Sequence, residues 1–316
     1  MMWAPDVEAF VRDLEAKPAA LRSLAEALAS DPWGDVGAHG RVIFIGMGSS
    51  RFAALPIAAR LRARGIGAAA EYASATMVDP GGPGTLAIGV SASGSTPETV
   101  EALARHRAAG SRTVAITNAD AGALADAAER HLPMLAGEEP GGVACRSFQH
   151  TLALLLSMLD ARRAADATRS AADATEDLLA RRDAWLPAAT ELLGTTGRAF
   201  LLAPDARSSS AAQGALMFRE GPRLQADACE TGDWLHVDVY LAKPLDYRAL
   251  LFAGSRFDAA VMGWLQERNG NALAVGRDVE GAAQILRYRH DEDETVALLT
   301  ETLVAELVAA ELWRGA

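Results

Sequence analysis

The sequence has 316 residues, half of them apolar, which is enough for two domains of ordinary size with a core in each. The net charge of -11 argues against a nucleic-acid surface, so any anion site has to be built locally from dipoles and hydroxyls. The two cysteines, Cys145 and Cys229, form no disulfide framework and fit a reducing cytoplasm. The first residues lack the basic and apolar regions of a signal peptide, and no apolar run approaches the length of a membrane span.

The first half of the chain alternates helical and strand patterns. Residues 6–29 carry apolar side chains at helical spacing, and Pro18 interrupts them, so we expect two helices there. The pattern then predicts a strand at 41–45, a helix at 52–64, a short strand at 68–72, a strand at 86–90, a helix at 99–109, a strand at 113–117 and a helix at 121–130. This alternation is typical of a parallel sheet covered by helices on both faces.

A second half with the same order of elements follows a long helical stretch at 148–179, in which we expect a break near 162–170. It predicts a strand at 198–202, a loop at 208–210, a helix at 212–220, a strand at 248–252, a helix through Trp264, a strand at 272–275 and a terminal helix at 296–313. The offset of about 157 residues indicates a duplicated α/β unit. We therefore expect two flavodoxin-like three-layer α/β/α domains, at residues 1–180 and 181–316.

The clearest candidate site is the run Ser91–Thr96, between the strand at 86–90 and the helix that follows. Its hydroxyls are those of Ser91, Ser93, Ser95 and Thr96. Together with the free N–H groups at a positive helix end, they favour a bound phosphate. The alternative is a polar capping loop without a ligand, although a cap needs only one hydroxyl.

Six short segments follow one another along the chain: Leu14–Pro18, Gly46–Ser50, Ser91–Thr96, Ala136–Ala144, Gly214–Glu220 and Gly232–His236. In this order they resemble the double-SIS (sugar isomerase) domain family, above all the isomerase half of glucosamine-6-phosphate synthase and its stand-alone relatives. Those relatives include phosphosugar isomerases, deaminases and deglycases. The resemblance implies two tandem SIS domains and a phosphorylated sugar as ligand, although a fold alone does not set a reaction.

The resemblance also implies individual binding residues. The phosphate would be held by Ser50, Ser91, Ser93 and Thr96, with Ser49 and Ser95 beside them. The backbone of Val143 would meet sugar hydroxyls. The alternative for Ser49 and Ser50 is a simple helix cap.

The same resemblance implies a proton-transfer pair. Glu220 matches the family's catalytic glutamate, which moves a proton between C1 and C2 of the sugar. His236 matches the histidine that opens the sugar ring, and in the family it reaches the site from the neighbouring subunit, so a homodimer or higher oligomer is implied. Glu220 could instead be a solvated helix residue beside Arg219 or Arg223, and His236 a loop residue that only forms hydrogen bonds. Asp233 is interpreted as a supporting residue without a stated role.

The remaining histidines and cysteines predict no further chemistry. The spacing of His39, His106, His131, His150 and His290 forms no zinc pattern with the cysteines, so we interpret them as surface or structural residues. We expect no metal and no organic cofactor, and no nucleic-acid or membrane partner. Cys145 has no basic partner in the sequence that would activate it as a nucleophile.

Three departures separate the chain from the synthase that it resembles. First, we expect no glutaminase half. Second, the C-terminal tail has no lysine, since no lysine follows Lys243. Third, Met217 replaces the family's lysine one turn before Glu220. The loss of positive charge weakens contact with an anionic intermediate. The departures favour a stand-alone, cytoplasmic isomerase, deglycase or deaminase. Two alternatives stay open: a sugar-phosphate-binding or regulatory protein without turnover, and a dinucleotide-binding enzyme, disfavoured because Arg51 takes the place of the third glycine.

Overall fold

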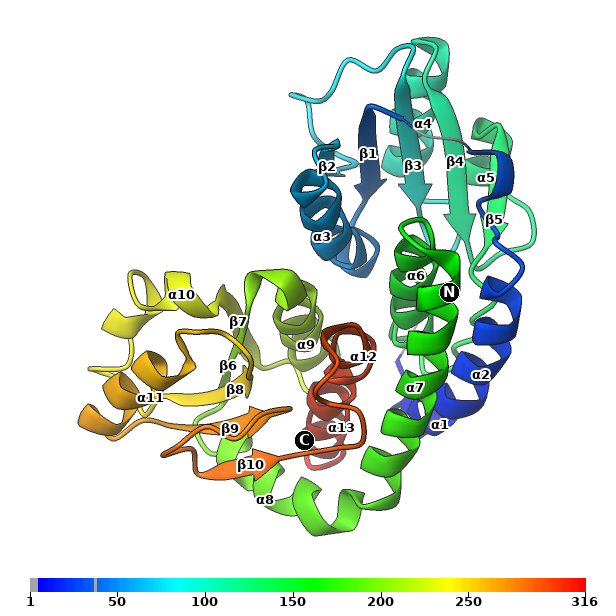
Figure 1. Ribbon diagram of the computed structural model, residues 1–316. Coiled ribbons are helices and arrows are strands. Elements are labelled where there is room, and N and C mark those ends of the chain that lie inside the picture. The colour runs from blue at the N-terminus through cyan, green and yellow to red at the C-terminus, as the bar shows by residue number, and fades with distance from the viewer. Residues whose placement is uncertain (1–4, 37–38) are drawn as a thin grey trace. The chain divides into compact units, whose positions relative to one another are not determined.

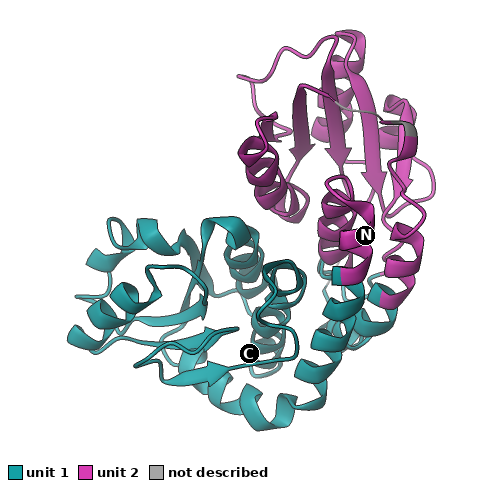
Figure 2. Ribbon diagram, in the orientation of Figure 1, with its two compact units in different colours: residues 1–21, 139–145, 167–316 teal, residues 22–138, 146–166 magenta. Residues whose placement is uncertain are grey.

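The computed structural model describes residues 5–36 and 39–316. The chain forms two compact units, unit 1 with residues 1–21, 139–145 and 167–316, and unit 2 with residues 22–138 and 146–166 (Figure 2). Compact units record which residues pack together, whereas the predicted division at residue 180 concerns domains along the chain, and it stays a prediction. The N-terminal residues 1–4, on which part of the signal-peptide interpretation depends, lie outside the described residues.

Unit 2 is built on a five-stranded parallel sheet with the strand order β2-β1-β3-β4-β5 (Figure 1). Its strands are β1 (Arg41–Gly46), β2 (Gly67–Tyr72), β3 (Thr85–Val90), β4 (Arg112–Thr117) and β5 (Arg130–Pro133). Its helices are η1 (Gly34–Val36), α3 (Gly48–Ala63), α4 (Pro97–Ala108), α5 (Ala123–Ala127) and α6 (Arg146–Ser157). On one face of the sheet, Ile43 and Ile45 of β1 share a core with Leu103 of α4 and Leu124 of α5.

Unit 1 carries a second five-stranded parallel sheet, with the order β10-β9-β8-β6-β7. Its strands are β6 (Arg198–Ala203), β7 (Gln225–Glu230), β8 (Arg248–Phe252), β9 (Asn271–Val275) and β10 (Gln284–Leu286). Its helices are α1 (Val7–Glu15), α8 (Arg182–Gly194), η2 (Asp205–Arg207), α9 (Ser208–Glu220), α10 (Thr231–Trp234), η3 (Asp238–Tyr240), α11 (Asp258–Glu267), α12 (Glu294–Thr300) and α13 (Thr302–Arg314). Two more helices, α2 (Lys17–Leu28) and α7 (Ala161–Ala180), have residues in both units.

The two sheets have the same topology. Counted along the chain, each runs second, first, third, fourth and fifth strand across the sheet, which is the flavodoxin-like doubly wound order. The strand β6 starts at residue 198 and β1 at residue 41, so the offset is the predicted 157 residues. The expected α/β class, with two parallel sheets flanked by helices, is confirmed.

The helical stretches differ from the prediction in three places. The predicted break near 162–170 is wrong: α7 is continuous, and the interruption lies at 158–160, where the Asp160 side chain accepts a hydrogen bond from the Arg163 N–H at 2.9 Å and caps the new helix. The helix predicted at 121–130 is only five residues long and gives way to β5. The predicted terminal helix is two helices, α12 and α13, which are separated at Glu301.

The two N-terminal helices are as predicted, whereas the loop predicted at 208–210 is wrong. The N-terminal periodicity forms two helices, α1 and α2, with Pro18 in the first turn of α2, where its missing N–H is harmless. The serines at 208–210 belong to the first turn of α9 rather than to a loop. In the described ranges 5–36 and 39–316, we find no helix with the length and apolar character that crossing a membrane requires.

Candidate functional site

The strand order places a candidate site at the carboxyl ends of β1 and β3. These strands are neighbours, yet the chain leaves β1 toward β2 on one side and returns to β3 on the other. Such a switch point leaves a crevice beyond the strand ends, and ligands of open α/β sheets bind there. The Gly46–Ser50 and Ser91–Thr96 segments follow these two strands directly.

The segment 91–96, which we call the hydroxyl loop, gathers its side chains around Ser91. The Ser91 Oγ lies 2.8 Å from the Thr96 Oγ1 and 3.3 Å from the Ser93 Oγ, and the Ser95 Oγ lies 3.1 Å from the Ser93 Oγ. Ser91 is buried, whereas Ser93 and Ser95 are exposed. The hydroxyls therefore form one connected set that reaches from the strand end to the surface.

This set does not cap the helix that follows it. Thr96 is the N-cap residue of α4, and its side chain forms no cap hydrogen bond. The N–H groups of Ala92, Ser93 and Thr96 find no acceptor among the described residues, and the buried Thr99 Oγ1 in the first turn has no partner there either. The loop thus combines several donors without acceptors and a helix N-terminus of positive potential, which suits an anion better than a simple cap.

Ser49 and Ser50 lie in the first turn of α3, directly after β1. Both are half-buried, and the Ser50 N–H donates to the Met47 carbonyl at 3.1 Å. Met47 is the N-cap residue of α3, and no side chain caps this helix. The two serines therefore add hydroxyls at the strand next to β3, and the interpretation as plain caps has no hydrogen bond to support it.

In unit 1, the segment that carries Val143 is held from two sides. The Gly141 N–H donates to the Asp13 carboxylate of α1 at 2.8 Å, and the Gln213 Nε2 of α9 donates to the Ala144 carbonyl at 2.9 Å. A Cβ at Gly141 would lie 2.4 Å from the backbone of Phe10, so only glycine fits there. The backbone around Val143 is thus fixed in position against α1 and α9.

Glu220 is the last residue of the same helix α9. Gln213, Met217 and Glu220 are spaced by four and three residues and therefore share one helix face, the face from which Gln213 reaches the Val143 segment. Glu220 is half-buried, and burial raises the pKa of its carboxyl, while Arg223 opposes the shift. A half-buried carboxyl with a raised pKa has the properties of a general acid and base.

Arg219 does not neutralise Glu220 in the way that a solvated ion pair would. It donates to the Ala226 carbonyl and lies 3.8 Å from the Asp227 carboxylate. Met217, which takes the place of the family's lysine, is buried at 1% exposure. The face of Glu220 is therefore poor in positive charge.

His236 lies just after the short helix α10, and its side chain is exposed. Its N–H donates to the Asp233 carbonyl at 2.8 Å, and the Asp233 N–H donates in turn to the Glu230 side chain, which caps α10. Asp233 itself is exposed. The geometry presents the imidazole to the surface, where no described residue of this chain forms a hydrogen bond with it.

The predicted residues fall into two sets. Ser49, Ser50 and the hydroxyl loop lie in unit 2, whereas Val143, Glu220 and His236 lie in unit 1. Each set is described by itself, and their union in one site stays a prediction. Sequence analysis did not single out Gln213, although its place seven residues before Glu220, on the same helix face, was readable from the spacing.

The other candidates have structural partners. His150 contacts the Met134 carbonyl at 2.9 Å, and His131 contacts the Thr117 hydroxyl at 2.8 Å. Cys145 is fully buried, and burial raises the pKa of its thiol, which argues against a nucleophile. Within residues 5–36 and 39–316, no three His, Cys, Asp or Glu side chains are grouped so that they could hold a metal ion.

The fold defines the class: an α/β protein with a hydroxyl-rich loop at the switch point of a parallel sheet. Residues 37–161 match the family model of the SIS domain.

The chain is similar in sequence to part of an aminotransferase. It is 29% identical over 256 residues to the glutamine–fructose-6-phosphate aminotransferase (isomerizing) of Aeropyrum pernix, covering 74% of this chain and 41% of that protein. The chain thus matches about two-fifths of the length of this curated relative.

Solved structures share the fold over nearly the whole chain. The tagatose-6-phosphate ketose/aldose isomerase of Escherichia coli gives a TM-score of 0.82 at 18% identity, covering 99% of this chain and 95% of its own. The C-terminal domain of glucosamine-fructose-6-phosphate aminotransferase from Francisella tularensis gives 0.80 at 15% identity, covering 97% and 96%. At these identities the similarity establishes the fold and leaves the reaction open.

Proposed function

We propose that this protein binds a phosphorylated sugar or amino sugar and catalyses a proton transfer between its C1 and C2. This is the reaction type of an aldose–ketose isomerase, or of a deglycase or deaminase that works by the same isomerisation. The observation that carries the proposal is the hydroxyl loop, with its connected hydroxyls and its N–H groups without acceptors at the β1/β3 switch point. The phosphosugar names of the relatives agree with this ligand class.

The residues divide the chemistry between them. Ser50, Ser91, Ser93 and Thr96 bind the phosphate, with Ser49 and Ser95 beside them, and the Val143 backbone contacts sugar hydroxyls. Glu220 removes the proton from C2 of the open-chain aldose and returns it to C1, while the hydroxyl proton passes from O2 to O1, so that carbonyl and hydroxyl exchange places without any net oxidation. Its raised pKa favours both halves of this transfer. His236 assists ring opening by proton transfer at the ring oxygen.

The second sheet belongs to a second SIS domain in this proposal, because it repeats the strand order of the first. The protein acts as a homodimer, and His236 serves the site of the neighbouring subunit. This is supported by the exposed side chains that follow His236, namely Val237 at 52%, Tyr240 at 72% and Leu241 at 39% exposure, which form an apolar surface suited to a partner. The proposed location is the cytoplasm, where sugar phosphates are metabolised.

A second candidate is a sugar-phosphate-binding or regulatory protein without turnover. One observation favours it: one turn before Glu220, on the same helix face, stands the buried Met217, so this position offers no cation to an anionic intermediate. The two candidates make different predictions for Glu220, because a binding protein does not need a proton carrier.

The test combines a ligand screen with two variants. Thermal shift against hexose, amino-hexose and fructosamine phosphates identifies the ligand, since a ligand at a hundred times its Kd stabilises the fold by about 2.7 kcal/mol. Ser93→Ala should reduce the shift, because it weakens binding. Glu220→Gln should keep the shift and abolish turnover in an isomerase, whereas a binding protein shows no turnover in either form. A well-folded protein that no phosphosugar stabilises would contradict the proposal.

A further inference from the structure

The two sheets allow their carboxyl-end loops to be compared residue by residue. The Ser91 N–H, just after β3, donates to the Ile116 carbonyl at 3.1 Å, and the Ala253 N–H, just after β8, donates to the Val275 carbonyl at 2.9 Å. These are the same bond in the two sheets, since both join the residue after the third strand to the fourth strand. Ser91 therefore corresponds to Ala253.

This correspondence extends to the residues that we assign to the phosphate. Counted from these two residues, Ser255 and Asp258 take the positions of Ser93 and Thr96, although α11 begins at Asp258 itself whereas α4 begins one residue after Thr96. Ser50 follows the end of β1 by four residues, and Arg207 follows the end of β6 by four. We call the second segment, residues 253–258, the carboxylate loop.

The N–H groups of the carboxylate loop bind a carboxylate that belongs to the loop itself, that of Asp258. The Gly254 and Ser255 N–H groups both donate to the Asp258 Oδ2, at 2.6 and 3.1 Å. The corresponding N–H groups in the hydroxyl loop, those of Ala92 and Ser93, have no acceptor among the described residues. In the carboxylate loop the Asp258 carboxylate accepts from these N–H groups, whereas in the hydroxyl loop they have no acceptor among the described residues.

The counterpart of Ser50 supplies the opposite charge. Arg207 is 1% exposed and donates to the Ala253 carbonyl at 2.6 Å and to the buried Glu301 at 3.1 Å. Its guanidinium lies against Gly254, where a Cβ would come within 3.0 Å of Nη2 and where the φ of +138° also favours glycine. The positive charge opposes the rise that burial causes in the pKa of Asp258.

The fit of the carboxylate is incomplete. Asp258 is only 8% exposed, and its Oδ2 accepts both N–H groups, while its Oδ1 has no hydrogen-bond partner. A buried carboxylate oxygen without a partner is costly. Such an unpartnered oxygen is expected where a carboxylate, which has two oxygens, occupies a position suited to a phosphate, which has more.

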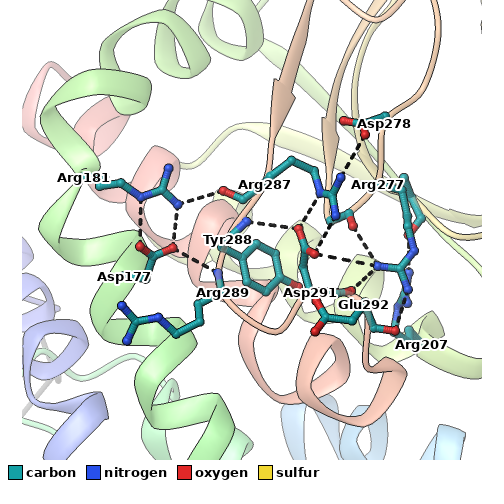
Figure 3. Close-up of polar contacts among 12 residues, drawn as sticks. Asp177, Arg181, Arg207, Arg277, Asp278, Arg287, Tyr288, Arg289, Asp291 and Glu292 are labelled. Carbon is teal, nitrogen blue, oxygen red and sulfur yellow. Dashed lines mark hydrogen bonds and ion pairs between the residues drawn. The ribbon is translucent and has the colours of Figure 1, made fainter.

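The remainder of this sheet edge is also occupied by the chain's own charges (Figure 3). Beyond β10, Arg287 forms two bonds to the Asp291 carboxylate, at 2.6 and 2.8 Å. Beyond β9, Arg277 donates to the Glu292 carbonyl at 2.8 Å. The arginines beyond β9 and β10 are therefore hydrogen-bonded to acceptors of the chain itself.

We propose that unit 1 retains the anion-binding loop of unit 2 in a self-occupied form, in which the Asp258 carboxylate takes the place of an external phosphate. The chain then binds phosphate once rather than twice, and the second loop serves to fix the start of α11 to the sheet. This inference rests on the phosphate role that we propose for the hydroxyl loop.

The test removes the internal anion and supplies one from solution. In Asp258→Ser the side chain becomes a hydroxyl, like that of its counterpart Thr96. We expect a lower Tm than in the wild type, a dose-dependent recovery with inorganic phosphate at constant ionic strength, and an increase from one to two phosphates per chain in calorimetric titration. The matched control is Asp183→Ser, another acidic residue in the first turn of a long helix, which should gain no phosphate site.

The outcomes are separable. Recovery with formate but not with phosphate would overturn the proposal, because it would reveal a site for a carboxylate only, and so would recovery with neither anion. If Asp258→Ser does not fold, Asp258→Asn is the second variant, because it keeps an acceptor and removes the charge. A Tm equal to that of Asp183→Asn would overturn the proposal, whereas a clearly lower Tm would support it. Ser93→Ala in the wild-type background tests the hydroxyl loop alone, so failure of the proposed function appears there and not at Asp258.

Discussion

A buried ion pair in unit 1 allows a quantitative prediction. The Lys17 Nζ donates to the Glu306 carboxylate, and the two side chains are 2% and 0% exposed. Lys17→Met keeps the volume of the side chain and leaves Glu306 as an uncompensated buried charge, which costs about 3–5 kcal/mol. In a domain of this size the loss lowers Tm by roughly 6–20 °C.

The pH dependence of this loss gives a second readout. Burial raises the pKa of Glu306, and Lys17 opposes the shift. Because the folded-state pKa lies above the unfolded one, the penalty of the ionised carboxylate is present at neutral pH and is relieved as the pH falls through the folded pKa. Without Lys17 this pKa rises further, so the stability deficit of Lys17→Met should shrink as the pH falls from about 8 to 5.5.

The assay is urea unfolding followed by tryptophan fluorescence, with two controls. Lys17→Met combined with Glu306→Met removes both charges and should recover most of the loss, since apolar replacement of a buried pair is often neutral or stabilising by about 1–4 kcal/mol. Arg182→Met breaks an exposed pair with Glu15 and should cost less than about 1 kcal/mol. If Lys17→Met were no more damaging than Arg182→Met, the assignment of a buried, uncompensated charge would be refuted.

Three further predictions concern the candidate site. Ser93→Ala should raise the Kd for a sugar phosphate by about 10- to 150-fold in calorimetry, because a hydrogen bond to a charged group contributes about 1.5–3 kcal/mol, while the exposed Ser23→Ala should leave it unchanged. Turnover should fall on the acidic side with a midpoint above the usual glutamate range, because burial raises the pKa of Glu220 and the base must be ionised; a midpoint in the ordinary range would argue against this role. Gln213→Leu should raise KM more than it lowers kcat, because the Ala144 carbonyl loses its donor and the Val143 segment loosens, and an unchanged KM would show that the segment needs no such support.

All central strands were predictable from the sequence, whereas of the four edge strands only β2 was predicted, at 68–72. The strands β1, β3, β6 and β8 are apolar runs buried on both faces, which is the pattern of a parallel sheet. The missed strands β5, β7 and β10 are all edges, and each is short or polar with exposed positions, such as Gln225 at the start of β7. An edge strand pairs on one side only, so its side chains need not be apolar.

The positions of helix interruptions were also only partly predictable from the sequence. The run at 161–180 is rich in alanine and contains no glycine or proline, so its composition predicts no particular break. The true start of α7 has a local cause, the Asp160 cap, whereas the separation of α12 from α13 coincides with Glu301, whose partner Arg207 is 94 residues away in the sequence. The first is visible in sequence as an aspartate before a helical run, but the second depends on the tertiary fold.

The candidate site was predictable as far as side chains define it. The sequence shows the hydroxyl side chains of residues 91–96 directly. It does not show which N–H groups lack an acceptor, because this depends on the folded backbone. Asp258 shows why this matters. The sequence shows only that the segment at 253–258 lacks the serine-rich pattern of residues 91–96, whereas the structure shows that the Asp258 carboxylate accepts from the Gly254 and Ser255 N–H groups.

The two loops together bear on how a protein with a net charge of -11 can bind a phosphate. The carboxylate loop holds an anion through two backbone N–H groups, so the acidic surroundings do not prevent anion binding at this position of the fold. In unit 1 the buried Arg207 helps to balance the charge, whereas its counterpart in unit 2 is the neutral Ser50. The hydroxyl loop therefore depends on hydrogen bonds more than on a neighbouring cation, and the salt dependence of phosphate binding should be weaker there than in an opened carboxylate loop.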